Sequence, residues 1–242
     1  MTRDHKNRET CLQENRLVTQ LRQGSTVGWP ICLGYIPIGL ALGVLAQQSG
    51  FPYWAVGMMS ILVFAGSAQF ICVAMVTNQA SAAAIILTTL VVNLRHALMS
   101  SALAVHLSGV NRWFLAFFSY GITDESFAVN MAQFRTTDWT RWHGLAVNQS
   151  TNLVWIFSTV AGCLIGQFIP QGAFGIDYAL IAMFLCLLGY QLTSPIHLCT
   201  AAMATLISVL WYLNIPGESY IVGASMSAAT LGYLIQRTWI RS

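Results

Sequence analysis

Three charged side chains stand in long stretches of sequence that otherwise carry no charge. Residues 23–94 contain no Asp, Glu, Lys or Arg, and Arg95 then appears beside His96 within an apolar run. Asp124 and Glu125 are adjacent in the next apolar run. An arginine at the centre of a bilayer costs roughly 2.5–3.5 kcal/mol on insertion scales, so it is kept where it is paired or faces a polar cavity. The pattern predicts that Arg95 pairs with one of the two carboxylates.

The second carboxylate and the histidine leave two alternatives open. A structural salt bridge needs only one carboxylate, so the other could bind an ammonium group or carry a proton. A single histidine in a membrane helix more often forms a hydrogen bond between helices than it carries a proton. Asn93 lies three residues before His96, so both side chains share one helix face. We therefore treat Asn93, Arg95, His96, Asp124 and Glu125 as candidate pathway residues.

Polar and small residues recur at positions that could line the same pathway. Ser119, Thr123, Ser126, Asn130 and Gln133 are spaced four, three, four and three residues apart, which places them on one helical face. We expect this polar face, including Thr123 and Asn130, to turn toward the interior of a helix bundle.

Two further stretches combine glycine, proline and polar side chains. Proline frees the carbonyl one turn back, and glycine permits close approach of another helix. Each stretch is therefore either a kinked packing helix, with a Gly39–Gly43 contact in the first, or an interrupted helix whose freed backbone groups bind substrate. Gln69 either bonds a neighbouring helix or lines the pathway. The candidate positions are Tyr35, Pro37, Gly39, Gly66, Ser67 and Gln69.

The composition places these residues in a membrane protein. The chain is 56% hydrophobic and 8% charged, whereas a soluble domain carries about 25% charged residues. Continuous apolar runs favour helices over the alternating strands of a barrel. The basic residues stand at the ends of these runs rather than in one patch, so we expect no nucleic-acid binding. No G-x-S-x-G, H-E-x-x-H, Walker A or C-x-x-C motif occurs, and we expect neither an enzyme nor a bound cofactor or metal.

The fold class predicted from these runs is all-α: a polytopic membrane helical bundle with seven or eight transmembrane segments, some broken or short. Residues 1–22 form a charged cytoplasmic tail without a cleaved signal peptide, and residues 23–242 form a single transmembrane domain. With the N-terminus cytoplasmic, the basic residues fall mostly inside, and only Arg112 falls outside. The expected spans are roughly 26–47, 55–76, 82–107, 113–133, 144–169, 176–192, 195–213 and 219–236.

Four short motifs resemble the AzlC family, the large subunit of branched-chain amino-acid exporters. They are G-Y-I-P-I-G at 34–39, F-A-G-S-A-Q-F at 64–70, N-L-R-H at 93–96 and T-D-E-S-F-A at 123–128. The resemblance covers roughly residues 24–240. It implies a multi-pass permease of the bacterial inner membrane that works with a small hydrophobic subunit of the AzlD type. Some members have Asp at the position of Asn93, so a mechanism that needs a carboxylate there does not transfer to this chain.

The functional hypothesis is a secondary transporter that exports valine, leucine, isoleucine and sometimes methionine, driven most simply by protons. The substrate ammonium would meet Asp124 or Glu125, and its carboxylate would meet Arg95 or backbone donors at broken helices. The side chain of the substrate would be enclosed by Phe64, Phe70 and Phe127. The alternative is an uncoupled channel, or a structural membrane subunit that scaffolds a partner protein. The direction of transport rests on the resemblance alone.

Overall fold

The structure is a computed structural model of the chain. It describes residues 2–169 and 195–214, and a few positions beyond them, namely 178, 182, 185, 188, 189, 192, 227, 228 and 230–232. Side chains are described from residue 15 onward within the first range and from residue 197 within the second. All regular secondary structure in this part of the chain is helical. The chain divides into two compact units, residues 1–77 with 93–177 and residues 78–92 with 178–242.

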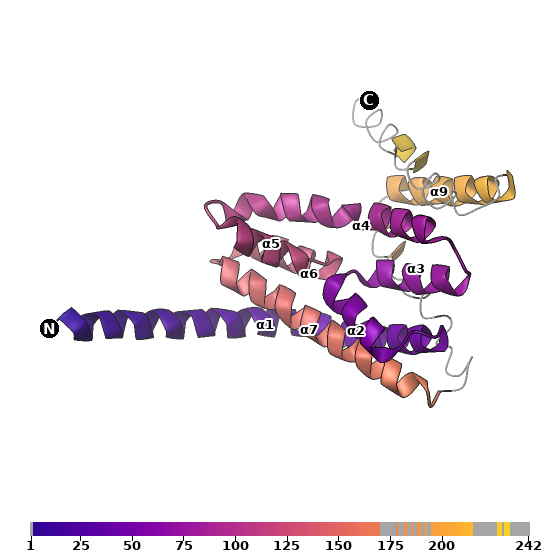
Figure 1. Cartoon of the computed structure of the whole chain (residues 1–242). Coiled ribbons are helices and arrows are strands. Elements are labelled where there is room, and N and C mark those ends of the chain that lie inside the picture. Colours follow the sequence, from indigo (N-terminus) through magenta and orange to yellow (C-terminus); the bar gives the residue numbers. More distant parts are fainter. Residues whose placement is uncertain are drawn as a thin grey trace, which may run out of the picture. The chain divides into compact units, whose positions relative to one another are not determined.

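Two long parallel helices run through the first unit (Figure 1). They are α1, Thr2–Gln48, and α7, Arg141–Gly166. Small residues let their backbones touch along the whole contact: a Cβ on Gly24 would lie 2.3 Å from the His143 carbonyl oxygen, and one on Gly162 would lie 2.2 Å from that of Leu40. Such close approach is how helices associate in lipid, where burial of apolar surface gives no advantage.

The proline-containing stretch of the first span belongs to this packing. Pro30 and Pro37 both lie inside α1, which continues without a break to Gln48. The interrupted-helix alternative for residues 34–39 is therefore wrong. Gly39 and Gly43 both back directly onto α7, as the packing alternative predicted. Contacts with α7 from Gly24 to Val44 lie on both sides of the two prolines, and they hold α1 together where the prolines remove backbone hydrogen bonds.

The segment predicted to be the second span is a helical hairpin. It consists of α2, Tyr53–Leu62, and α3, Gly66–Thr77. Ten residues extend about 15 Å, half of a hydrocarbon core of about 30 Å. Gln69 Nε2 donates to Ser60 Oγ across the hairpin at 3.1 Å, and the Thr77 hydroxyl donates to Ser49 Oγ at 2.8 Å. The chain therefore returns to the end of the unit where α1 finishes, and the prediction that residues 55–76 cross the membrane is wrong.

The segment predicted to be the fourth span is a second hairpin, made of α5, Arg112–Tyr120, and α6, Asp124–Thr136. Near its start the Phe114 ring lies 5.1 Å from the ring of Trp142 in the first turn of α7. Asn130 of α6 then bonds both Asn148 and Trp139 at 3.0 Å, so α6 returns toward the same end. The prediction that residues 113–133 cross the membrane is also wrong. These two segments are therefore removed from the expected seven or eight membrane crossings.

The break in this second hairpin has a local cause. Thr123 has an extended backbone and caps α6, accepting a hydrogen bond from the Ser126 N–H, while Ser126 accepts one from the Thr123 N–H. This reciprocal pair satisfies two backbone groups at the new helix start. Gly121 lies against Asn148 of α7 with no room for a side chain, since a Cβ there would be 2.8 Å from Asn148 Cβ.

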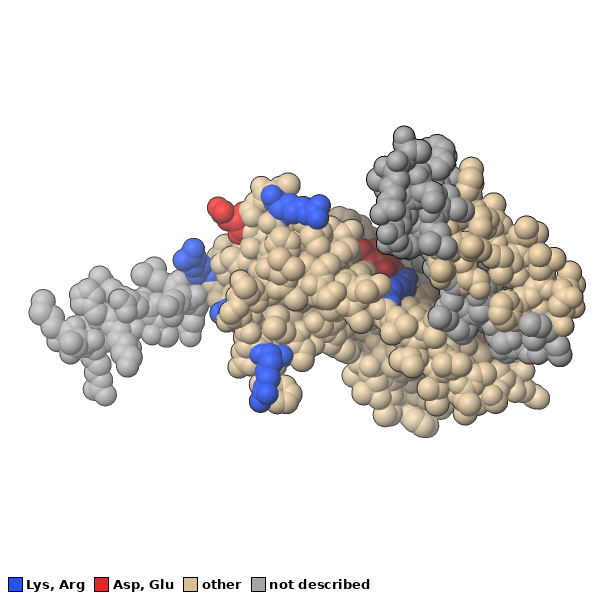
Figure 2. All heavy atoms as spheres, turned by 90° about the horizontal axis from the view of Figure 1, so that it is seen from above, with Lys and Arg blue, Asp and Glu red and all other residues tan. Residues whose placement is uncertain are grey.

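The second hairpin also corrects the predicted topology. The Arg141 guanidinium lies 5.7 Å from the ring centre of Phe114, so Arg112 is at the same end of the unit as Arg141. The prediction that Arg112 and Arg141 lie on opposite sides of the membrane is wrong. Every described arginine except Arg95 belongs to one end of the unit, so the basic residues are more strongly segregated than expected. On the face drawn in Figure 2, most blue and red spheres lie over the left-hand part of the described surface, and one red and blue group lies apart from them, to the right.

The third predicted span is a helix, as expected. It is α4, Ala82–Ala104, continued by the 3-10 turn η1, Val105–Leu107. The helix begins in the second unit and ends in the first. Its last turns join α5, α6 and α7 in an apolar cluster built on Leu103, Leu107, Phe118, Ile122 and Leu145. This cluster fixes the position of Arg95 along the unit, because Arg95 lies two turns before Leu103 on the same helix.

The described part of the second unit contains α9, Pro195–Asn214, which matches the predicted span 195–213. The predicted spans 176–192 and 219–236 lie almost wholly outside the described residues. Three described segments are long and apolar enough to cross a membrane: Asn15–Gln48, Ala82–Leu107 and His197–Asn214. The described part of the chain is thus all-helical, and it contains segments that are able to span a membrane.

Candidate functional site

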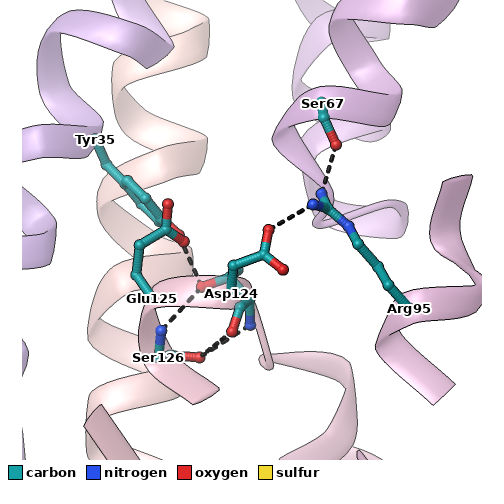
Figure 3. Close-up of polar contacts among 7 residues, drawn as sticks. Tyr35, Ser67, Arg95, Asp124, Glu125 and Ser126 are labelled. Carbon is teal, nitrogen blue, oxygen red and sulfur yellow. Dashed lines mark hydrogen bonds and ion pairs between the residues drawn. The ribbon is translucent and has the colours of Figure 1, made fainter. Parts of the chain in front are cut away.

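The two hairpins enter the first unit from opposite ends and meet at their tips. The tips are residues 63–65, between α2 and α3, and residues 121–123, between α5 and α6. Side chains from α1, α4 and both hairpins connect them (Figure 3). We call this group the tip site; it consists of Tyr35, Ser67, Arg95, Thr123, Asp124 and Glu125.

Arg95 joins the first turns of the two returning helices. Its Nη1 lies 2.5 Å from Asp124 Oδ2 in α6, and its Nη2 donates to Ser67 Oγ in α3 at 2.5 Å. The pairing predicted for Arg95 is confirmed, and Asp124 is the partner. About a third of each side chain remains exposed, 32% for Arg95 and 37% for Asp124. The pair thus links the tips and is only partly buried.

Glu125 has a different partner. The Tyr35 hydroxyl lies 2.7 Å from Glu125 Oε2 and 2.7 Å from Thr123 Oγ1. A phenol has one proton, so it donates to one of these acceptors at a time. Tyr35 is 7% exposed, and its ring meets Phe64 and Trp155 edge-on at 6.3 and 5.3 Å. Glu125 is therefore held by a rigid neutral group, whereas Asp124 is held by a cation.

A second link between the tips was missed by the sequence reasoning. The Tyr120 hydroxyl, at the end of α5, donates to the Ile61 carbonyl near the end of α2, and it accepts a bond of 3.3 Å from Asn152 Nδ2 of α7. The last carbonyls of a helix have no partner within it, so Tyr120 satisfies a group that the break in the first hairpin exposes. The signal in the sequence was a tyrosine directly before Gly121 within an apolar run.

The two helix starts at the tips differ in charge. The first turn of α6 contains Asp124 and Glu125 and has a complete cap. The first turn of α3 contains no acidic residue, and the Arg95 guanidinium is bonded to it through Ser67. The N-terminus of a helix presents free N–H groups and a partial positive charge. The start of α3 together with Arg95 therefore favours an anion, while Glu125 favours a cation.

Two polar atoms on α4 lie buried near this site without a hydrogen-bond partner among the described residues. They are Asn93 Oδ1 and Arg95 Nε, one acceptor and one donor. His96 follows Arg95 on the same helix and is half-buried. The structure thus places Asn93 and His96 within one turn of Arg95, the residue of α4 that contacts both returning helices.

Two predicted site residues belong to separate buried networks. Gln69 accepts from Trp155 Nε1 at 2.7 Å and donates to Ser60, whose hydroxyl lies 2.9 Å from that of Thr159. Asn130 links Asn148 of α7 to Trp139. Both amides thus have partners that fix a hairpin to α7.

The remaining predicted residues pack rather than present polar groups. Gly66 lies under the Trp155 indole, where a Cβ would be 3.0 Å from the ring, and Gly39 backs onto Ser158. Pro37 lies inside α1, two residues after Tyr35. These residues make the close helix contacts that fix the positions of Tyr35 and of the first tip along the unit.

These features define an integral helical membrane protein in which discontinuous helices place charged groups inside the bundle. In membrane transport proteins, substrate and ion sites are commonly built from such helices. The model of the AzlC protein family matches residues 30–169, which is more than half of the chain. The chain belongs to the AzlC family.

Curated relatives extend this match along most of the chain. It is 27% identical to inner membrane protein YgaZ of Escherichia coli over 225 residues, which cover 90% of this chain and 91% of that protein. It is 24% identical over 206 residues to the branched-chain amino acid transport protein AzlC of Bacillus subtilis, covering 85% and 80%. A membrane protein of Helicobacter pylori is 24% identical over 208 residues, covering 86% and 90%. No solved structure matches the chain.

Proposed function

We propose that this chain is a secondary transporter that exports branched-chain and related neutral amino acids, methionine included, across the bacterial inner membrane. The observation that carries the proposal is the tip site, where a paired Arg95–Asp124 and a separately held Glu125 lie between two opposed hairpins. The similarity to a branched-chain amino acid transport protein supports the substrate class. The arginine-rich end of the first unit is cytoplasmic, and so is the N-terminus.

The substrate zwitterion fits the distribution of charge in the tip site. Its ammonium group binds Glu125, because Asp124 is already neutralised by Arg95. Its carboxylate binds the free N–H groups at the start of α3, next to the Arg95 guanidinium, in the way that helix N-termini bind anions. Phe64, at the first tip, offers an apolar contact to the side chain. An aliphatic substrate therefore needs no further polar partner.

The proton carrier is the titratable group that Arg95 does not neutralise. Asp124 is excluded by its ion pair, which leaves Glu125 and His96. Each hairpin closes one end of the unit, so a small displacement of one tip opens the site to one side only. Alternating exposure of this kind, with the coupling proton on Glu125, drives export against a substrate gradient.

From the family resemblance we further propose that transport requires a small hydrophobic membrane subunit of the AzlD type. Efflux from cells that express the chain alone and from cells that express it with the candidate subunit separates the two cases. Efflux only in the second case supports a two-component exporter.

The test of the function compares two carboxylate variants in cells preloaded with labelled leucine. Glu125→Gln should abolish the efflux that an uncoupler abolishes in the wild type, because a glutamine can neither carry a proton nor balance an ammonium group. Asp124→Asn should lower the amount of folded protein, because it leaves Arg95 without its counter-charge. If both variants reach the membrane and leave efflux and its pH dependence unchanged, the assignment is wrong. Efflux that ignores an imposed proton gradient would indicate a channel instead.

A further inference from the structure

A cleft opens at the cytoplasmic end of the first unit, away from the tip site. It has a volume of about 730 Å³ and lies between α1, the end of α6 and the turn into α7. Ligand pockets usually measure about 300–1,000 Å³, so the cleft can hold a small molecule with its water. Its lining residues that matter for recognition are Val18, Arg22, Val27, Gln133, Asp138 and Trp139.

The cleft carries one positive and one negative side chain that do not pair with each other. Arg22 belongs to α1 and Asp138 to the turn before α7, and both are exposed. Among the residues that the structure describes, the one ion pair is that of Arg95 with Asp124. The lining also includes the apolar side chains of Val18 and Val27 and the indole of Trp139. The cleft thus presents opposite charges together with an apolar surface.

The walls of the cleft are held in place without a ligand. His143 Nδ1 accepts the Thr140 N–H at 3.1 Å, and its Nε2 lies 3.0 Å from Gln23 Oε1 of α1. The Trp139 ring stacks on His143 at 4.7 Å, and its Nε1 donates to Asn130. A preformed site loses less entropy on binding than one that must be ordered.

The cleft and the tip site lie along the same two helices. Val27 of the cleft and Tyr35 of the tip site are eight residues apart on α1, and so are Gln133 and Glu125 on α6. Eight helical residues correspond to about 12 Å. The cleft and the tip site are therefore about two helical turns apart along both helices.

We propose that this cleft is a second binding site, which captures a zwitterionic amino acid from the cytoplasm before the molecule reaches the tip site. Arg22 binds the carboxylate, Asp138 binds the ammonium group, and the two valines and Trp139 contact an aliphatic side chain. A free anion or cation gains only one of these contacts, so the cleft selects neutral amino acids. This inference rests on the proposed transport function.

The test measures initial rates of leucine uptake into everted membrane vesicles that contain the chain together with the candidate small subunit and have their cytoplasmic face outside. Arg22→Gln and Asp138→Asn should each raise KM about two- to fivefold, the range expected for one exposed ion pair. Vmax should stay unchanged, because neither residue belongs to the tip site. Arg16→Gln is the matched control: Arg16 is exposed on the same helix but does not line the cleft, and its KM should equal that of the wild type.

The outcomes separate this inference from the proposed function. An unchanged KM in both cleft variants, with uptake still abolished by Glu125→Gln, overturns the cleft proposal and leaves the transport function intact. Wild-type vesicles that take up no neutral amino acid overturn both.

An ethanolamine lipid headgroup carries the same two charges and is the competing occupant. The KM measurements are therefore repeated in proteoliposomes of phosphatidylglycerol and cardiolipin. A KM effect that persists there supports amino-acid binding, whereas one that disappears assigns the cleft to the headgroup and overturns the proposal.

Discussion

The two hairpins have similar shapes, but their returning helices begin with residues of different charge. The α2–α3 hairpin contains no charged side chain, and its one amide, Gln69, is fully engaged with Ser60 and Trp155. The α5–α6 hairpin begins its returning helix with Asp124 and Glu125. The first therefore supplies a hydroxyl and a helix start, and the second supplies the carboxylates. In the proposed transport function, this difference lets the two tips bind opposite ends of a zwitterion.

Each hairpin is fixed to α7 by its own buried amide, which is separate from the charged tip residues. Gln69 connects to Trp155 and, through Ser60, to Thr159; Asn130 connects to Asn148. The two amides thus form a structural class, whereas the charged tip residues form the ligand-binding class of the proposed transport function.

The largest effect is expected when the link between the tips is removed. Removing one partner of a buried ion pair costs roughly 3–5 kcal/mol, and the partial exposure of Arg95 and Asp124 should lower this figure. Arg95→Gln should therefore reduce the folded fraction in detergent, measured by size exclusion and by the thermal midpoint. The double variant Arg95→Gln with Asp124→Asn should recover much of the loss. A double variant that is no more stable than the single one would show that charge pairing does not join the hairpins.

A smaller and equal effect is expected at the two amides. Gln69→Leu leaves the Trp155 indole N–H unpaired, and Asn130→Leu does the same to that of Trp139. Each unsatisfied buried donor costs about 1–3 kcal/mol, which should lower the midpoint of thermal unfolding. The KM for leucine should stay at its wild-type value in Gln69→Leu. A raised KM in Gln69→Leu with unchanged stability would move Gln69 from the structural class to the ligand-binding class.

The smallest effect is expected at the second link between the tips. Tyr120→Phe removes the hydrogen bond to the Ile61 carbonyl and should cost about 0.5–1.5 kcal/mol, the usual net value for one bond. Tyr53→Phe is the matched control, since Tyr53 is an exposed residue of α2 that lies outside the tips. Equal thermal midpoints for the two variants would remove Tyr120 from the link and leave Arg95 as the main connection.

The amino-acid sequence alone determined the class of this protein and the identity of its unusual residues. Low charge and continuous apolar runs can be accommodated only in a membrane, and the helices at 26–47, 82–107 and 195–213 followed from run length. The isolation of Arg95 required a partner for energetic reasons, and the partner is Asp124. Positions such as Tyr35 and Ser67 were identified by residue type, although their partners were not.

The hairpins were decided by tertiary structure. An apolar run of about 20 residues has the same composition whether it crosses the bilayer or turns back inside a bundle, because both surroundings are apolar. The run at 113–133 did contain a helix-start signal, a threonine followed by two acidic residues and a serine, which can be read as a cap. In the first hairpin, no comparable signal marks residues 63–65.

The return of α6 to the end where α5 began decides which carboxylate pairs with Arg95. It also decides at which end of the unit Arg112 lies. Adjacent residues such as Asp124 and Glu125 point about 100° apart on a helix, so one meets Arg95 and the other meets Tyr35. Sequence fixes that separation, but only packing against α1 and α4 decides which side chain receives the cation.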